Sequence, residues 1–321
     1  MNIKNKYDLA IVIPAYKIDF FDSVLKSLAN QTNKNFTIYV GIDASKSDFE
    51  SIIDIYSNSL DIVFKRFEEN LGGKDLVAQW ARCIELTNGE PWIWLFSDDD
   101  MMESTCVEKF YQEIANGAVY DLYHFDIDAI DEKDNVIFKC RRFPEVLSSI
   151  DFYRKKENDD IDCFVVEYIF SRAVYEKTGG FQKFDLAWGA DVATWTKFSN
   201  EKGIRNIKGG KVYWRKSYAN ITPNRKREMV NRKFLINVDY YNWINHFFGR
   251  NRIAKFNEYV FIRNFVFYSV ILTRQQLKEI SQKAVSLDII PSWKPKCLLI
   301  LLPLVRIAKI LKSKIKKKNI Q

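Results

Sequence analysis

The sequence predicts an α/β protein with a mainly parallel β-sheet, helices on both of its faces, and a basic helical C-terminal extension. Apolar runs of strand length alternate with amphipathic segments over residues 9–96, which is the pattern of right-handed strand–helix–strand crossovers. Positive charge concentrates from residue 204 onward. With 321 residues, 47% of them hydrophobic, the chain is long enough for one large core plus an extension.

Four strands are expected in the first part of the chain. Each is an apolar run bounded by polar or turn-forming residues. The first run (LAIVI) is expected to stop at Pro14, which cannot donate to a sheet ladder. The four runs are residues 9–13, 36–42, 60–67 and 92–96.

Three helices are expected between these strands. Apolar residues recur at 20, 21, 24, 25 and 28, which places them on one helical face. Ser47 or Asp48 is suited to cap the next helix, and Gly72 with Gly73 leads into the third. The three segments are residues 19–30, 47–58 and 74–87.

The later part of the chain is less regular. Strands are expected at residues 119–128 and 135–140, joined as a hairpin through the turn 131–134. Residues 191–200 are expected to be helical, and residues 224–284, rich in aromatic and basic side chains, to form several helices. The expected domains are a sheet domain at 1–220, a basic and aromatic helical extension at 221–290, and a basic tail at 291–321.

Composition argues against several kinds of site. The five cysteines have no paired spacing, which argues against a disulfide framework or a zinc knuckle and fits a reducing compartment. With His124 and His246 as the two histidines, a His-rich metal site or a Ser-His-Asp triad has little material. The N-terminal residues lack the apolar stretch of a signal peptide.

Turn-forming or polar residues follow three of the predicted strands. In an open parallel sheet, ligands bind at the carboxyl ends of the strands, so these segments are expected to meet at one crevice. They are Pro14, Ala15 and Tyr16 after the first strand, Asp43 and Ser45 after the second, and residues 97–100 (SDDD) after the fourth.

The acidic triplet Asp98, Asp99 and Asp100 is the most specific site signal. Adjacent carboxylates repel one another, and a divalent cation relieves the repulsion because hard cations take carboxylate oxygens. A solvated turn that caps the following helix is the alternative. On an extended segment, the side chains of Asp98 and Asp100 face the same way and Asp99 points elsewhere. Which of the three would bind the ion directly stays open.

Taken in order, the motifs resemble those of the family 2 glycosyltransferases, which have the GT-A fold. The resemblance covers roughly residues 8–215 and lies in the order and spacing of the motifs. They are IVIPAY (11–16), GIDAS (41–45), NLG (70–72), WAR (80–82), NGE (88–90), SDDD (97–100), and GGF (179–181) followed by Asp191.

The resemblance implies an inverting transfer from a nucleoside diphosphate sugar, with UDP as the expected nucleotide, to a hydroxyl of a glycan or lipid-linked acceptor. It implies Mg²⁺ or Mn²⁺ at Asp98, Asp99 or Asp100. Asp191 is the implied general base, in apolar surroundings that raise a carboxylate pKa; a helix N-cap is the alternative. The implied donor contacts are Pro14, Ala15, Tyr16, Asp43, Ser45, Arg82, Asp98 and Asp99, and the implied acceptor-side residues are Gly180, Phe181 and Trp188.

Within this resemblance, Tyr16 is expected to meet the nucleobase and Asp43 to accept a hydrogen bond from its imide nitrogen. Ordinary turn residues are the alternative for both. Arg82 is expected at the phosphates, with Arg215 or Lys216 as a further candidate.

The sequence departs from the family pattern at three alanines. Ala44 follows Asp43 where a second acidic residue is common, and Ala81 replaces a frequent asparagine. The frequent Glu-Asp pair at the catalytic position is Ala190 and Asp191 here, which leaves one carboxylate to act. These departures leave the donor sugar undefined.

The charge is divided unevenly along the chain. Residues 1–203 carry 23 Lys and Arg against 36 Asp and Glu, a net charge of −13, and residues 204–321 carry 26 against 5, a net charge of +21. Residues 297–318 combine apolar and basic residues, and their apolar part is shorter than the roughly 20 residues that span a bilayer. A cytoplasmic protein is expected, attached through this tail to the anionic inner face of the plasma membrane. Packing of the tail on its own domain is the alternative.

Three other functions compete with sugar transfer. The basic region suits nucleic-acid binding, but no zinc finger, RNP strand or helix-turn-helix motif accompanies it, so no nucleic acid is expected. A nucleotidyltransferase would need a Gly-rich loop after the first strand, which IVIPAYK lacks. An inactive GT-A scaffold would keep the same motifs. The Lys-, Asn- and Ile-rich composition favours a bacterial enzyme of surface polysaccharide synthesis.

Overall fold

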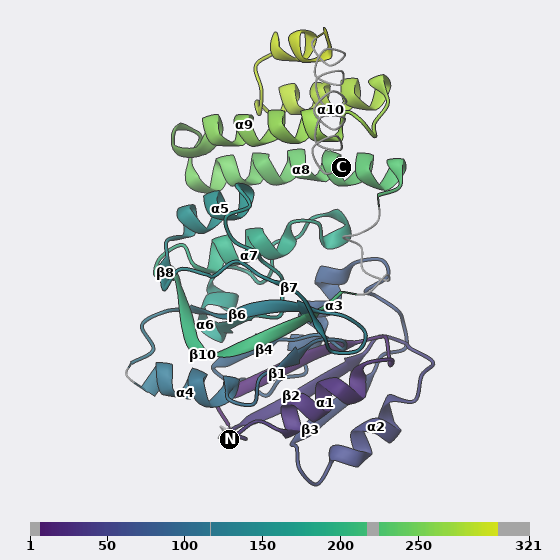
Figure 1. Ribbon diagram of the computed structural model, residues 1–321, viewed down its shortest axis with the longest axis vertical. Helices are drawn as coiled ribbons and strands as arrows, with labels where there is room; N and C mark the ends of the chain where they lie inside the picture. The colour runs from purple at the N-terminus through teal and green to yellow at the C-terminus, as the bar shows by residue number, and fades with distance from the viewer. Residues whose placement is uncertain (1–6, 116, 217–224, 301–321) are drawn as a thin grey trace, which may run out of the picture. The chain divides into compact units, whose positions relative to one another are not determined.

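In the computed structural model, which describes residues 7–115, 117–216 and 225–300, the chain divides into two units, Met1–Ala219 and Asn220–Gln321. Figure 1 shows a sheet with helices on both faces in the first unit and a group of helices in the second. The sheet unit contains all of the proposed donor and catalytic residues.

One sheet of ten strands runs through the first unit. The strands are β1 (Leu9–Ala15), β2 (Phe36–Ile42), β3 (Ile62–Arg66), β4 (Trp92–Leu95), β5 (Met101–Met102), β6 (Leu122–Ile130), β7 (Val136–Lys139), β8 (Val146–Leu147), β9 (Tyr168–Ser171) and β10 (Ile204–Arg215). The main order is β3-β2-β1-β4-β9-β6-β10-β5, with β7 paired to β6 and β8 paired to β10.

The predicted parallel arrangement is confirmed for the first four strands, because β1 pairs in parallel with β2 and β4, and β2 with β3. β9 is antiparallel to both of its neighbours, β4 and β6. β10 is again parallel to β6, across a register shift between Ile207 and Lys211. The carboxyl ends of β1, β2, β4, β6 and β10 therefore lie at one edge of the sheet, together with the amino end of β9.

Pro14 lies inside β1, so the expectation that it ends the strand is wrong. β1 pairs with β4 from Leu9 to Val12, and the Phe96 N–H donates to the Val12 carbonyl. Two residues further on, the Pro14 nitrogen faces this same side, where the ladder with β4 has ended. No ladder hydrogen bond is lost at Pro14, and the strand continues to Ala15.

Helices cover both faces of the sheet (Figure 1). One core contains the inward side chains of β1 and β2 together with α1, α2 and α4, and α3 packs on the opposite face of the same strands. Asp48, one of the two predicted caps, accepts the Ser51 N–H at the start of α2. The helices of this unit are α1 (Phe21–Ala29), α2 (Phe49–Tyr56), α3 (Leu76–Ile84), α4 (Cys106–Ala115), α5 (Ser149–Glu157), α6 (Arg172–Lys177) and α7 (Ala190–Phe198).

The contact between β2 and α3 is unusually close. A Cβ atom on Gly41 of β2 would lie 2.3 Å from the Sγ of Cys83 on α3 and 3.0 Å from the Phe67 ring. Real Cβ atoms do not approach neighbours so closely, so a glycine is required at position 41. The absence of a side chain lets α3 settle directly over the last part of β2, beside Asp43.

The second unit consists of helices, as the sequence predicts for residues 224–284. They are α8 (Arg227–Phe248), α9 (Arg250–Tyr268) and α10 (Arg274–Ser286). Gly249, with φ at 83°, makes the turn between α8 and α9, and Phe234, Phe261 and Phe265 pack between these two helices. A buried hydrogen bond of 2.7 Å from Asn257 Nδ2 to Asn245 Oδ1 fixes their register.

No helix in residues 7–115, 117–216 and 225–300 combines the length and the apolar character that crossing a bilayer requires. Most of the tail predicted to lie on a membrane, residues 301–318, is outside the described residues. Membrane attachment through it stays a prediction.

Candidate active site

The acidic turn after β4 is tied to the carboxyl end of β1. Asp98 Oδ2 accepts hydrogen bonds from the backbone N–H groups of Tyr16 and Lys17, each at 2.7 Å. Lys17 Nζ lies 3.8 Å from Asp99 Oδ2. The Tyr16 side chain is 54% exposed and so accessible to a ligand. Two of the three strand ends expected to converge are thus in direct contact.

The carboxylates of Asp98 and Asp100 bind different segments of the chain. The backbone bends at Asp98 and Asp99 instead of remaining extended. Asp98 is turned toward the end of β1, whereas Asp100 Oδ1 accepts the backbone N–H of Arg215, the last residue of β10, at 2.6 Å. Asp99 Oδ1 accepts a hydrogen bond from the hydroxyl of Ser97. Asp98 and Asp100 therefore do not form the matched pair expected of an extended segment.

The ionised form of the carboxylates in this turn is electrostatically unfavourable. All three side chains are buried. Burial, followed by the charge of Asp99, raises the pKa of Asp98 to about 6 and raises the pKa of Asp100 well above its ordinary range. Protonation or a bound cation would relieve this strain.

Asp43 lies at the carboxyl end of β2, next to the end of β1. Its backbone N–H donates to the Ala15 carbonyl at 2.8 Å, and its side chain is buried. The carboxylate accepts the backbone N–H groups of Leu71 at 2.7 Å and Gly72 at 2.8 Å. The end of β2 and the loop before α3 are thereby joined to the end of β1, which also binds the acidic turn.

Arg82, expected at the phosphates, is engaged with Asp43. Its Nη2 lies 2.7 Å from Asp43 Oδ1, and its guanidinium carbon lies 3.7 Å from the centroid of the Phe67 ring. The structure thus pairs Asp43, expected at the nucleobase, with Arg82, expected at the phosphates. Ser45 is also buried nearby, and its hydroxyl accepts the Ser47 N–H at 3.4 Å.

Asp191 lies in the first turn of α7 but does not cap it. Gly189, with φ at 78°, occupies the N-cap position. Asp191 Oδ1 accepts the Val192 N–H at 2.8 Å. Burial raises the pKa of this half-buried carboxyl, and the Lys156 charge on α5 acts in the opposite direction. The N-cap alternative for Asp191 is therefore wrong.

The segment before α7 is held in an unusual conformation. Leu186 and Ala187 have φ angles of 57° and 53°, in the left-handed region that non-glycine residues rarely adopt. Strain of this kind persists where the surrounding structure enforces it, often at functional sites. Trp188, one of the expected acceptor-side residues, follows directly and is half-buried.

Gly180 and Phe181, the other expected acceptor-side residues, pack along α7 away from its first turn. The Phe181 ring lies 6.3 Å from Phe198 in the last turn of α7, and also near Trp80 and Tyr175 at 5.6 and 5.2 Å, measured between centroids. The Gly180 carbonyl accepts a hydrogen bond from Nζ of Lys197, in the last turn of α7. These contacts give both residues a packing role.

Sequence reasoning missed two titratable residues near Asp191. Glu167 is fully buried, and within the part of the chain that the structure describes its Oε2 has no hydrogen-bond partner. Burial raises the pKa of Glu167 to about 8, and the Asp191 charge adds to the increase. The signal for Glu167 was its isolation in the apolar run FVVEYIF. Lys156, among the basic residues that end α5, gave no such signal.

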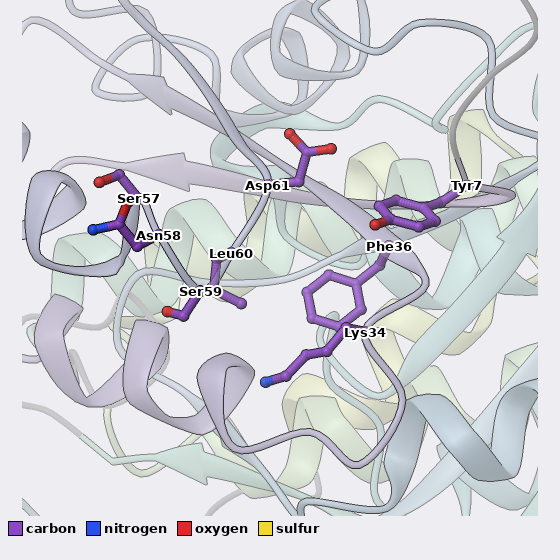
Figure 2. A pocket seen from close by; sticks show the side chains of 8 residues that line it. All are labelled: Tyr7, Lys34, Phe36, Ser57, Asn58, Ser59, Leu60 and Asp61. Carbon is purple, nitrogen blue, oxygen red and sulfur yellow. The ribbon is translucent and has the colours of Figure 1, made fainter.

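A polar cavity of about 260 Å³ lies at the opposite edge of the sheet (Figure 2). Phe36, the first residue of β2, and Asp61, just before β3, line it, so it is at the amino ends of these strands. Lys34 also lines it, with its Nζ bound to the Leu28 and Ala29 carbonyls at the end of α1. This cavity is therefore separate from the acidic turn, which follows the carboxyl end of β4.

Residues 10–179 match the family described as Glycosyl transferase family 2. No curated protein sequence matches the chain. Similar solved structures include S. aureus TarS 1–349 in complex with UDP-GlcNAc, with 13% identity, coverage of 88% of this chain and 89% of that one, and a TM-score of 0.57. The same fragment in complex with UDP is 14% identical, with coverage of 94% of this chain and 87% of that one, and a TM-score of 0.59. Likeness at this identity establishes the fold, and the predicted GT-A class is confirmed.

Proposed function

This chain belongs to glycosyl transferase family 2, and from that premise we propose that it transfers a sugar, with inversion, from a UDP-sugar to a hydroxyl group of a glycan or lipid-linked acceptor. The observation that carries the proposal is the junction of strand ends, where Asp98 accepts the N–H groups of Tyr16 and Lys17 at 2.7 Å. This junction supports the proposal because it brings the candidate nucleotide contact Tyr16 next to the candidate diphosphate position at Asp98.

Tyr16 and Asp43 are the proposed contacts of the uracil base. The exposed Tyr16 ring offers a face or edge to a planar base, and Asp43 offers a carboxylate to the imide N–H. Pro14, Ala15 and Ser45 complete the strand ends around them. The presence of UDP-GlcNAc and UDP in the similar TarS structures supports a UDP-linked donor.

Asp98, Asp99 and Asp100 are the proposed ligands of Mg²⁺ or Mn²⁺. The burial of all three side chains and the raised pKa values of Asp98 and Asp100 favour a cation at this turn. Among the residues that the structure describes, no three His, Cys, Asp or Glu side chains are grouped to enclose a metal ion. Mg²⁺ is usually held by one or two carboxylates, with substrate phosphates and water as its other ligands, so one or two of the three aspartates are sufficient. When bound, the ion offsets charge on the departing diphosphate.

Asp191 is the proposed general base. Its carboxylate takes the proton of the acceptor hydroxyl as that oxygen attacks the anomeric carbon. The bond from this carbon to the diphosphate oxygen breaks, and UDP leaves with the electron pair. A single displacement of this kind inverts the anomeric configuration. Partial burial supports the role, because a raised carboxylate pKa brings the base closer to the proton affinity that catalysis needs.

The acceptor and the location in the cell are proposed from charge. The net charge of +21 from residue 204 onward favours an anionic membrane surface, where a lipid-linked acceptor of bacterial surface polysaccharide synthesis would be found. Sedimentation with anionic and with neutral vesicles tests this. We expect binding to the anionic vesicles alone, weakened by salt; protein that stays in the supernatant with anionic vesicles would contradict it.

The donor is tested by thermal unfolding with UDP-, GDP- and dTDP-sugars, each with and without Mn²⁺. We expect a UDP-sugar to raise the melting temperature in the presence of Mn²⁺, since a ligand at about 100 times its Kd stabilises the fold by about 2.7 kcal/mol. Release of UDP, with the sugar transferred, then identifies the reaction. Stabilisation by none of the nucleotide sugars, with Mn²⁺ present and the protein folded, would contradict the proposal.

A further inference from the structure

Arg215, the last residue of β10, is fully buried under the acidic turn. Its backbone N–H donates to Asp100 Oδ1 at 2.6 Å, and its side-chain Nε donates to the Asp99 carbonyl at 2.8 Å. One residue thus holds both the main chain and a carboxylate of the turn. Because it is buried, Arg215 does not present its guanidinium to the phosphates.

The other end of the guanidinium is anchored on the turn between β6 and β7. Nη1 donates to the Asp131 carbonyl and Nη2 to Asp134 Oδ1, each at 2.6 Å. That turn is held by its own bonds, because Asp131 Oδ1 accepts the N–H groups of Lys133 at 2.8 Å and Asn135 at 2.9 Å. Arg215 therefore connects the acidic turn to a segment that is already fixed.

A third segment packs against the same guanidinium through the ring of Phe20. The guanidinium carbon lies 4.2 Å from the centroid of the Phe20 ring, in the stretch that leads from Tyr16 and Lys17 into α1. The planar fork of an arginine bonds in several fixed directions at once, which a lysine ammonium does not. The acidic turn is thereby held from one side through Asp98 and from the other through Arg215.

We propose that Arg215 is a positioning residue of the donor site, which holds the Asp99 backbone and the Asp100 carboxylate in the orientation that receives the nucleotide diphosphate and its divalent cation. This inference rests on the function proposed above. Arg215 acts through the acidic turn and touches neither the donor nor the acceptor. Residues behind metal ligands fix the orientation of those ligands, and their loss weakens metal binding.

The test compares Arg215→Met with a matched arginine at the other edge of the sheet. Arg172 is half-buried, and it also braces the chain, because its Nε donates to the Glu90 carbonyl and its Nη2 to Thr87 Oγ1, each at 2.7 Å. Glu90 precedes β4, so Arg172 lies at the amino end of that strand. Arg172→Met removes a similar set of side-chain hydrogen bonds at a position away from the acidic turn.

Calorimetry of UDP binding in Mn²⁺, electron paramagnetic resonance of bound Mn²⁺ and the melting temperature are measured for each full-length variant. We expect Arg215→Met to weaken Mn²⁺-dependent UDP binding by about 10- to 100-fold. Arg215→Lys should lie between Arg215→Met and wild type. Arg172→Met should lower the melting temperature and leave UDP affinity unchanged. With a donor substrate, the loss should appear chiefly in KM.

Equal UDP affinity in folded Arg215→Met and wild type would overturn the inference, as would equal weakening by Arg172→Met. If Arg215→Met does not fold, Asp134→Gly decides, since it removes the half-exposed side chain that accepts the Nη2 hydrogen bond, and glycine accommodates the φ of 64° at this position. Weaker UDP binding then supports the inference, and unchanged binding overturns it. Failure of wild-type protein to bind UDP with Mn²⁺ would instead contradict the proposed donor.

Discussion

Arg82 Nη2 lies 2.7 Å from Asp43 Oδ1, so an ion pair joins α3 to the carboxyl end of β2. The same carboxylate accepts two backbone N–H groups, from Leu71 and Gly72. A Cβ atom at Gly72 would be 2.8 Å from Asp43 Oδ2. Asp43 is therefore the point where β2, the loop before α3 and α3 itself meet, and its position determines the shape of the proposed nucleotide site.

Asp43→Asn is expected to lower both stability and UDP affinity. An asparagine has one carbonyl oxygen, and its amide group cannot accept the second N–H, so a buried donor is left unpaired at about 1–3 kcal/mol. Urea unfolding and calorimetry of UDP binding measure the two effects. Asp48→Asn is the matched control, because asparagine caps α2 as well as aspartate does. Unchanged UDP affinity in Asp43→Asn would exclude Asp43 from the uracil contact.

Asp191→Asn is expected to abolish most transfer while UDP binding stays as in wild type. Removal of a general base lowers the rate by about 10²- to 10⁴-fold. Initial rates of UDP release in the presence of an acceptor provide the measurement. Glu201→Gln, which alters an exposed ion pair with Lys177, should retain activity. A full rate in Asp191→Asn would assign the base to another residue.

Lys156→Met is expected to move the acidic limb of the activity profile to higher pH. The base acts when deprotonated, so activity rises as the pH passes through its pKa. The Lys156 charge lowers the pKa of Asp191, and its removal therefore raises that pKa further. The measurement is kcat/KM against pH for wild type, Lys156→Met and Lys156→Arg. Lys155→Met, a neighbouring change on α5, should leave the limb in place; an identical shift there would show that Lys156 has no specific effect.

His124 is expected to make the sheet unit less stable as the pH falls from about 6.5 to about 4. Burial lowers the pKa of His124 to about 4. Between these values the unfolded chain binds a proton that the folded protein does not, so stability falls with decreasing pH by about 1.4 kcal/mol per pH unit. Urea unfolding across this range should show a smaller slope in His124→Gln than in wild type. The exposed His246 offers the control His246→Gln, which should retain the slope of wild type.

Gly41→Ala is expected to destabilise the sheet unit by about 1–3 kcal/mol, because its methyl group would overlap the Cys83 sulfur. Cys83→Ala in the same chain should recover part of that loss, since it removes the sulfur. The two changes are thus expected to be non-additive in thermal unfolding. Strict additivity would mean that β2 and α3 separate to relieve the overlap.

The sequence predicted the elements whose patterns are local. β1 to β4 are short apolar runs, and β2 has the predicted bounds, residues 36–42. β9 was missed because its residues, YIFS, continue an apolar run interrupted by Glu167, and such a run does not distinguish strand from helix. β10 was missed because Gly209 and Gly210 lie at a register shift among alternating charged residues. Its shape depends on pairing with β6.

For the candidate site, the sequence predicted which strand ends meet but not how the side chains there pair. The order of strands placed Tyr16, Asp43 and the acidic turn at one edge, and the structure ties the ends of β1 and β4 together there. The pairing of Asp43 with Arg82 was beyond sequence reasoning, because it depends on how closely α3 approaches β2. The burial of Arg215 was also beyond sequence reasoning, since an arginine at the end of a strand is usually exposed to solvent.

The close approach at Gly41 has a consequence for the chemistry of Cys83. Burial raises the pKa of this thiol to about 12, and the thiolate is the form that reacts. Cys83 should therefore react with a thiol reagent only while α3 is lifted from β2, whereas the exposed Cys297 reacts at once. Because Arg82 is the preceding residue and binds Asp43, the rate at which the peptide that contains Cys83 is labelled reports how often α3 separates from the proposed nucleotide end of the sheet.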